Sequence, residues 1–406
     1  MNRRRIAAAA LAASLSLLTF AQVQASDSQQ PEPAGKSAQT IKWNPGHYMA
    51  SYKVLYPGNT LADVQGELND LRNQDAIVGY RVLIAWSALE DDEGKYTFSV
   101  LDDILNHLKT AYGKPKHMVV VVLPGAFHST EGKGVPSYIQ SSSVYGPSPV
   151  SGSYGWWGSS PGAGAICAAL WRPAVMARYA ALLTAMGAHY DADPNFEAVM
   201  IQEDAWISSA GTHYSRSDFD SSALISNLQG LLTTTTAAFP HTSVIMQNTY
   251  MPPSDAAENF ERWMIQNRVA PGTADTVGQT AFEKGYANTN LGLAWGIQSY
   301  MGITTPGGAY RGADYRGKAR AMLDVEAEEL AGKHYEKWGG IDGYTPLDII
   351  TAANQTYKAS HLFWTHLFGN ETYPAGGIPA ASKWANLAAT CAANPLTNTS
   401  YPGNYP

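Results

Sequence analysis

The sequence is poor in charged residues, and positive charge is the scarcer kind. Only 15% of its 406 residues are charged, and 34 acidic against 27 basic residues give a net charge of −7. Nucleic acids and anionic membrane surfaces attract basic proteins, so both are poor partners for this chain. The apolar stretch at residues 6–20 is too short for a comfortable membrane span. We therefore predict a soluble protein without an integral membrane segment.

Several signatures of enzyme chemistry are absent from the sequence. The ten histidines form neither an HxH nor an HExxH pattern, so the usual metal site of a barrel hydrolase is missing. The single GxSxG match, Gly158–Gly162, lies within the insertion predicted at residues 128–171 and not at the strand-to-helix turn that a nucleophilic serine requires. No glycine-rich loop follows the first predicted strand, which argues against a nucleotide-binding sheet. We expect neither a metal nor another cofactor.

The N-terminus has the features of an export signal. Arg3–Arg5 supply positive charge before the apolar stretch at residues 6–20, and a small-residue cleavage site ends at Ala25. These features predict a signal peptide over residues 1–25 and a secreted or periplasmic protein.

Cysteine is scarce, with Cys167 and Cys391 as the only two. In an oxidising compartment an isolated pair is most simply a disulfide, which would tie the C-terminal segment to the loop around residue 167. The alternative is a pair of buried thiols.

Short apolar runs alternate with amphipathic segments along most of the chain. This alternation predicts a parallel sheet, because the helices serve as crossovers between strands. The fold class is α/β, and eight strands fit a (β/α)8 TIM barrel, with an open doubly wound sheet as the alternative. The predicted strands are residues 47–52, 78–85, 117–123, 196–202, 243–248, 275–281, 320–325 and 361–367. The chain then divides into a disordered lead-in over residues 26–44, the barrel over 45–390 and a tail over 391–406, with a long insertion after strand 3 at residues 128–171.

Two of the predicted strands end in carboxylates. The run FEAVMIQEDAW, residues 196–206, turns polar at Glu203, and AMLDVEAE, residues 321–328, turns polar at Glu326. A barrel presents the carboxyl ends of its strands on one rim, where catalytic residues gather. Paired carboxylates suggest glycoside hydrolysis, in which one acts as acid and the other as base or nucleophile. In the second run Asp324 and Glu328 remain alternatives to Glu326.

The order of these motifs resembles that of the retaining glycoside hydrolases of clan A, a (β/α)8-barrel superfamily. The resemblance covers most of residues 45–370 and rests on Gly79–Ile84, on the passage Trp86–Phe98 and on the two strand-end glutamates. It implies that Glu203 is the acid/base, that Glu326 is the nucleophile and that Arg81 contacts the nucleophile. Arg81 in an apolar strand needs an acid as partner in any case, and Glu90 is the structural alternative. The family usually has Asn before the acid/base, where this chain has Gln202.

Other candidates for sugar binding are polar or aromatic residues near predicted strand ends or in the insertion. Aromatic faces stack on sugar rings, although most aromatic residues pack in cores. The resemblance places Trp364 where the superfamily has a Trp beneath the sugar, and packing in the barrel is its alternative. The set is Trp86, His128, Trp156, Trp157, Gln202, Asn248, Tyr250 and Trp364.

Together these features predict an exported glycoside hydrolase that cleaves O-glycosidic bonds in a polysaccharide or oligosaccharide by a two-carboxylate retaining mechanism. Two alternatives stay open. One is a non-catalytic carbohydrate-binding barrel, and the other is a polysaccharide lyase or transglycosylase on the same fold.

Overall fold

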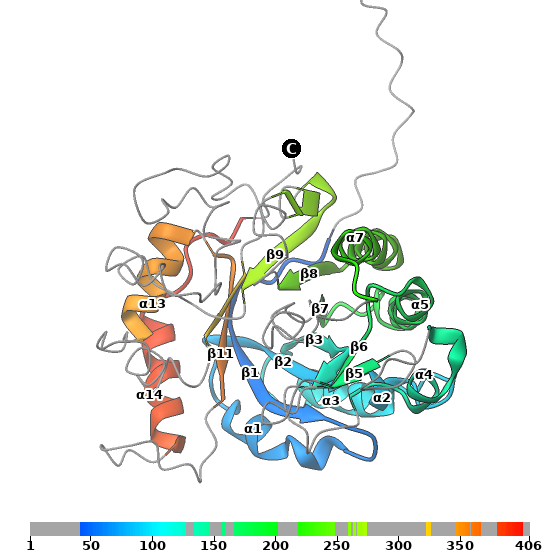
Figure 1. Ribbon diagram of the computed structural model, residues 1–406. Helices are drawn as coiled ribbons and strands as arrows, with labels where there is room; N and C mark the ends of the chain where they lie inside the picture. The colour runs from blue at the N-terminus through cyan, green and yellow to red at the C-terminus, as the bar shows by residue number, and fades with distance from the viewer. Residues whose placement is uncertain are drawn as a thin grey trace, which may run out of the picture. The chain divides into compact units, whose positions relative to one another are not determined.

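Eight parallel strands close into a barrel, in the order β1-β11-β10-β9-β8-β7-β3-β2 (Figure 1). This confirms the predicted TIM barrel. The strands are β1 (Gly46–Leu55), β2 (Ile77–Ala85), β3 (His117–Leu123), β7 (Phe196–Ile201), β8 (Ser243–Gln247), β9 (Val269–Thr273), β10 (Met322–Val325) and β11 (His361–Thr365). The computed structural model describes residues 41–126, 134–146, 156–158, 166–201, 218–247, 259–260, 263–264, 266–273, 322–325, 346–357, 359–366 and 380–400, all within the unit Thr40–Pro406.

The sixth strand lies earlier than the sequence predicts. We expect residues 275–281 from their pattern, whereas the strand that pairs with β8 and β10 is β9, Val269–Thr273. Its sequence contains Pro271 and Gly272, both of which count against a strand because proline removes a hydrogen-bond donor and glycine removes a side chain. The other predicted strands are confirmed, with ends shifted by a few residues.

The barrel strands separate two apolar clusters. The inner cluster fills the lumen and consists of Tyr48, Ala50, Val119, Val121, Leu123, Ala198, Met200, Ile245, Ala270 and Phe363. Alternate residues of the same strands, such as Val120, Val199 and Trp364, belong to the larger outer cluster beneath the helices. This follows from the strand period of two, which sends successive side chains to opposite faces. The lumen is therefore a packed core and not a pore.

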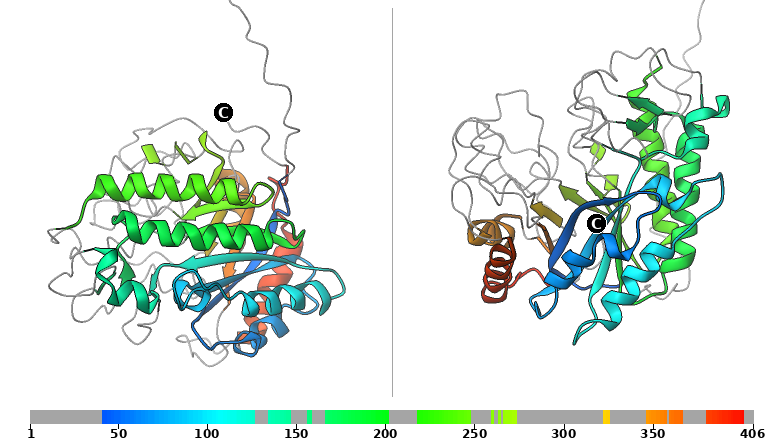
Figure 2. Two further views of the ribbon diagram at one scale, coloured as in Figure 1. Left: turned by 90° about the vertical axis from the view of Figure 1, so that its right-hand side faces the viewer. Right: turned by 90° about the horizontal axis from the view of Figure 1, so that it is seen from below.

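Helices surround the barrel. They are α1 (Gln65–Asp70), α2 (Trp86–Leu89), α3 (Ser99–Thr110), α4 (Ser137–Ser141), α5 (Pro173–Tyr190), α7 (Ser221–Ala238), α13 (Pro346–Ala352) and α14 (Ala380–Ala393), with short 3-10 or π turns at Leu61–Asp63, Ser143–Tyr145 and Ala353–Tyr357. Helices α5 and α7 lie side by side outside the barrel (Figure 2). Their approach requires Gly187, since a Cβ there would lie 2.4 Å from the carbonyl oxygen of Ala238.

A small antiparallel sheet follows β3. It contains β4 (Gly125–Ala126), β6 (Ile166–Ala168) and β5 (Trp156–Gly158), in the order β4-β6-β5. Because β4 begins two residues after the end of β3, this sheet adjoins the carboxyl end of the barrel.

The amino end of the barrel is closed by segments from both ends of the described chain. Trp43 Nε1 donates to the carbonyl of Thr399 at 2.8 Å, and His47 Nε2 lies 3.2 Å from the carbonyl oxygen of Asn394. Lys42 and Asn44, which fall within the predicted lead-in over residues 26–44, hydrogen-bond to Asp191 and Glu197, and residues 26–40 lie outside the described residues.

The predicted disulfide is not present. Cys167 lies in β6 and Cys391 in α14, and Figure 1 shows these two elements on opposite sides of the barrel. A disulfide requires Cα atoms within about 7 Å, so this arrangement cannot form one. Both side chains are buried in the outer apolar cluster, which is the thiol alternative, and burial raises the pKa of Cys391 to about 12.

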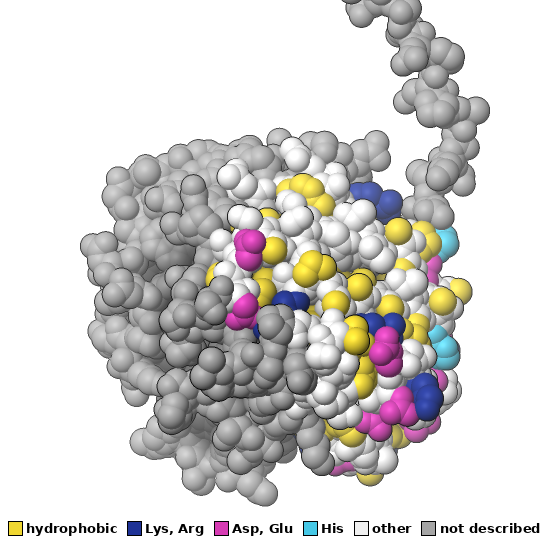
Figure 3. Space-filling model, turned by 45° about the vertical axis from the view of Figure 1, so that its right-hand side comes forward, with side chains coloured by type: hydrophobic (Ala, Val, Ile, Leu, Met, Phe, Trp, Pro, Cys, Tyr) yellow, Lys and Arg dark blue, Asp and Glu magenta, His cyan; other side chains and the backbone are white. Residues whose placement is uncertain are grey.

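On the face shown in Figure 3, the described acidic and basic side chains are interspersed among neutral and apolar ones, and neither charge forms a large patch of its own. Among the described residues, Val144 and Leu347 are the exposed large apolar side chains. No helix in this part of the chain is both long and apolar enough to cross a membrane.

Acid should destabilise the protein through His47. This side chain is 2% exposed, accepts a hydrogen bond from Trp364 Nε1 at Nδ1, and has its pKa lowered by burial from 6.5 to about 4. The unfolded chain therefore binds a proton between pH 6.5 and 4 that the folded protein does not. We expect the free energy of unfolding to fall across this window by about 3 kcal/mol.

Denaturant unfolding at a series of pH values measures this effect. His47→Gln should remove that part of the pH dependence, whereas His189→Gln, at an exposed position, should leave it in place. An unchanged pH dependence in His47→Gln would contradict the assignment.

Candidate active site at the carboxyl end of the barrel

The fourth and seventh barrel strands end directly before the predicted catalytic residues. β7 ends at Ile201 and β10 at Val325. Because every pair of neighbouring barrel strands is parallel, both ends lie on the same rim. Gln202, Glu203 and Glu326 themselves lie outside the described residues, as do His128, Asn248 and Tyr250.

Arg81 lies inside the barrel. It is 4% exposed, and its guanidinium carbon lies 5.5 Å from the ring centre of Phe363, a member of the inner cluster on β11. Since β1 lies between β2 and β11, the side chain passes over β1 to reach this ring. A guanidinium is always protonated, so its burial places a fixed positive charge in the lumen.

Glu90, the alternative partner for Arg81, lies elsewhere. Its fully buried carboxylate accepts hydrogen bonds from Trp86 Nε1 and from the backbone of Gly94, both at 2.8 Å, and from Arg178 of α5. Arg178 also donates to the hydroxyl of Tyr96 at 3.3 Å. Within the passage Trp86–Phe98 that carries the resemblance, the buried carboxylate of Glu90 therefore attaches the segment after β2 to α5.

Two aromatic candidates prove to be core residues. Trp86 is fully buried, hydrogen-bonded to Glu90 and packed 5.0 Å from the ring of Tyr179. Trp364 is also fully buried and donates to His47 at 3.1 Å, on the outer side of β11. Neither side chain faces the lumen, which corrects their prediction as sugar-binding residues. All five residues of β11 are buried, so its sequence does not distinguish the face toward the lumen from the face toward the helices.

Trp156 and Trp157 lie in β5. Their backbones pair with Ala168 and Cys167 of β6, next to the carboxyl end of β3. Their side chains lie outside the described part of the structure, so stacking on sugar stays a prediction. Among the residues that the structure describes, no group of three His, Cys, Asp or Glu could hold a metal ion.

The guanidinium of Arg172 joins three segments that lie next to the carboxyl end of the barrel. Arg172, 7% exposed, donates through Nε and Nη2 to Asp218, where the connection from β7 to α7 ends, and through Nη1 to the carbonyl of Tyr145. The neighbouring Gly146 has φ +126° and leaves room for Arg172, because a Cβ there would lie 2.8 Å from its Cδ. The sequence does not predict this contact, since nothing in local spacing joins residues 145, 172 and 218.

A second missed pair lies at the opposite end of the lumen. Glu197 of β7 and His361 of β11 are both fully buried, with Oε1 and Nε2 3.1 Å apart. Burial alone would raise the pKa of Glu197, but hydrogen bonds from His361 and Asn44 hold it below its ordinary value. A polar residue inside an apolar strand was the available signal.

Known structures share this architecture. The fold is that of the TIM-barrel glycosidases. The chain matches the GH5_18 protein of Streptomyces cattleya in complex with GlcNAc with a TM-score of 0.50 and 12% identity, over 88% of this chain and 81% of that one. It matches beta-galactosidases of Bacillus circulans sp. alkalophilus and Rahnella sp. R3 with TM-scores of 0.51 and identities of 10% and 11%.

The match covers 86% and 89% of this chain but only 56% and 57% of the two beta-galactosidases, so the chain spans little more than half their length. At such identities the likeness establishes the fold alone. No family model and no curated protein matches the sequence.

Loss of Glu90 should destabilise the fold strongly. Glu90→Ala leaves the partly buried Arg178 and the buried Trp86 without this acceptor, and removing one partner of a buried pair costs about 3–5 kcal/mol. Asp92→Ala, which removes an exposed pair with Lys95, should change stability little. Urea unfolding of both variants measures the difference, and equal effects would contradict the structural role of Glu90.

Proposed function

We propose that the protein is an exported glycoside hydrolase that cleaves O-glycosidic bonds in a polysaccharide by a retaining mechanism. Glu203 is the acid/base and Glu326 the nucleophile. The shared fold of the TIM-barrel glycosidases supports the reaction class. Export rests on the signal-like features of residues 1–25.

The position of Arg81 carries the assignment. The described pairing of β10 with β11 ends at Val325 and Trp364, which directly precede Glu326 and Thr365 in the sequence. Thr365 pairs with Ala50 of β1, and Ala50 pairs with Arg81 of β2. The guanidinium already lies over Phe363 of β11, one strand from β10. These positions support the proposal that Arg81 keeps the carboxylate of Glu326 ionised for nucleophilic attack.

The strand phase of β7 supports a role for Gln202. Ala198 and Met200 belong to the inner cluster, and Gln202 follows Met200 by two residues in the sequence. Its amide offers hydrogen bonds to a sugar hydroxyl at the rim, next to Glu203. Retention requires the two carboxyl groups to lie roughly 5–5.5 Å apart, with Glu203 protonated while Glu326 is ionised. Neighbouring carboxylates raise one another's pKa, which helps Glu203 to hold its proton.

Glu203→Gln should retain the fold and lose most activity on substrates with poor leaving groups. Proton donation contributes roughly 10²–10⁴-fold to such reactions. A dinitrophenyl glycoside does not need it, because dinitrophenolate departs without being protonated. Reducing-end release from a panel of polysaccharides and aryl glycosides measures both rates. Wild-type-like rates on all substrates would remove Glu203 from the role. An inactive wild-type protein that still binds polysaccharide would favour the binding-barrel alternative, and an unsaturated product would favour the lyase.

Glu326→Ala should abolish turnover, and azide should restore part of it. The rescued product carries the inverted anomeric configuration, because one displacement replaces two. Glu328→Ala should keep much of the activity, and Asp324→Ala should act mainly through stability. NMR of the first-formed products checks the configuration. Full activity in Glu326→Ala, together with an inactive Asp324→Ala or Glu328→Ala, would move the nucleophile to another carboxylate.

A further inference from the structure

Between its first two pairings with β3, β7 has one residue more than β3. Met118 of β3 pairs with Phe196, and the next residue, Val119, pairs with Ala198. Glu197 is thus the extra residue of a β-bulge. On the other side, the pairing of β7 with β8 starts only at Ala198.

The bulge reverses the alternation of side chains along β7. Phe196 belongs to the outer cluster, yet Ala198, two residues later, belongs to the inner one. In a regular strand these two would share a face. Past the bulge the alternation is regular, with Met200 inside and Ile201 outside. A single inserted residue therefore determines which residues of β7 face the lumen, as a shift by one residue does in any strand.

The Glu197 side chain is held inside the lumen by three hydrogen bonds. Its carboxylate accepts from the backbone N–H of Asn44 at 3.0 Å and from Asn44 Nδ2 at 2.7 Å. Its third contact is His361 Nε2 at 3.1 Å. The ring of His361 is stacked on Tyr48, with centroids 5.4 Å apart. The bulged residue thus has partners on the opposite side of the barrel that an alanine could not engage.

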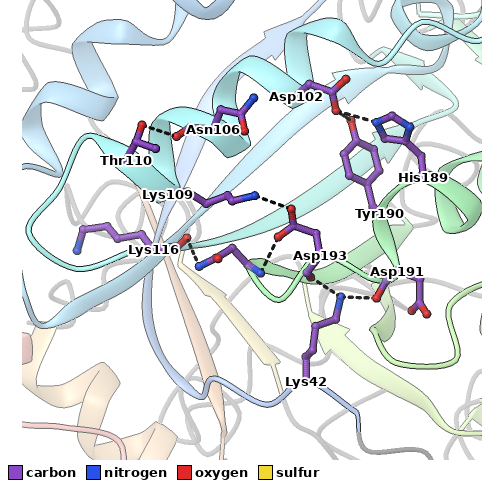
Figure 4. A network of polar contacts seen from close by, with 11 residues as sticks. Lys42, Asp102, Asn106, Lys109, Thr110, Lys116, His189, Tyr190, Asp191 and Asp193 are labelled. Atoms are coloured by element: carbon purple, nitrogen blue, oxygen red, sulfur yellow. Dashed lines mark hydrogen bonds and ion pairs between the residues drawn. The ribbon is translucent and has the colours of Figure 1, made fainter.

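The turn before β7 prevents the strand from sliding as a whole. Figure 4 shows Lys42 reaching this turn, where Nζ donates to the carbonyls of Asp191 and Asp193 at 3.0 and 2.9 Å. Lys109 of α3 forms an ion pair with Asp193 at 2.8 Å. With its start fixed, β7 can change phase only by gaining or losing the bulge.

We propose that Glu197 is a positioning residue that sets the phase of β7 and so presents Gln202 and Glu203 correctly at the rim. This proposal rests on the proposed function for its catalytic consequence. Without the carboxylate, β7 can pair with β3 residue for residue, and Ala198 and Met200 no longer face the lumen. Such a change does not alter β10, which directly precedes the proposed nucleophile.

The test compares Glu197→Ala, Glu197→Gln and Glu67→Ala with the wild-type protein. Glu67 is a matched control, because it is 4% exposed and accepts a hydrogen bond from Tyr80, but it lies on α1 and outside the lumen. Rates are measured on a dinitrophenyl glycoside and on an unactivated oligosaccharide, well below the unfolding temperature. Active enzyme is counted with a fluoroglycoside that traps the nucleophile.

In Glu197→Ala we expect the rate on the oligosaccharide to fall at least about tenfold more than the rate on the dinitrophenyl glycoside, since only the former needs the acid. Glu197→Gln, which retains an acceptor for Asn44, should recover most of this loss. Glu67→Ala should leave the ratio of the two rates unchanged. Equal losses on both substrates in Glu197→Ala would overturn the proposal.

A crystal structure of Glu197→Ala, or of Glu197→Gln if the alanine variant does not fold, decides the phase independently of activity. A lost bulge, or Ala198 and Met200 turned out of the lumen, supports the proposal, and an intact bulge with unchanged phase overturns it. Inactivity of the wild-type protein on every glycoside would instead refute the proposed function, and the crystal structure would still decide the role of Glu197.

Discussion

The pairing of β1 with both β2 and β11 is the constraint on which the structure depends. It joins the first and last barrel strands, so no sheet edge remains and each strand has its place relative to the others. Closure also brings distant parts of the chain to one rim. Ile201 and Val325, which end the fourth and seventh strands, are separated by more than a hundred residues in sequence, yet their strands open toward the same side.

Buried charges mark where this barrel differs from a purely apolar core. Each costs free energy to desolvate and needs partners in the interior. Glu90 meets Arg178 outside the barrel, and Glu197 meets His361 inside its amino end. Lys116 donates to two backbone carbonyls, and burial lowers its pKa to about 8. These groups fix the positions of segments at the amino end of the barrel and among the helices. Arg81 instead places its charge in the lumen, over Phe363 of β11, the strand next to β10.

The sequence predicts the barrel well because a parallel strand buried on both faces is a run of β-branched and apolar residues. His117–Leu123 is such a run, and its bounds agree with β3. The prediction failed where that signal was broken, as at Pro271 in β9. It also failed where the answer depended on which face a residue occupies. A strand that is buried on both faces, such as β11, does not show from its sequence that Trp364 points outward.

The sequence also could not predict which remote segments lie close together in the fold. A count of two cysteines cannot show that β6 and α14 lie on opposite sides of the barrel (Figure 1). The candidate acids were found because strand ends are visible in a pattern of polarity. Glu197 was visible as an interruption, but its function as a bulge required knowledge of the partner strand, because pairing between β3 and β7 is a tertiary property.

The contacts of Trp43 with Thr399 and of His47 with Asn394 have a consequence for connectivity. They bring the start of the first barrel strand and the segment after the last helix together, on the side of the barrel away from the candidate rim. A short linker from residue 400 to residue 41 would therefore convert the barrel into a continuous ring. Such a ring could be reopened between two outer helices, as circular permutation requires. The order in which the eight strands are synthesised is then separable from the order in which they pair.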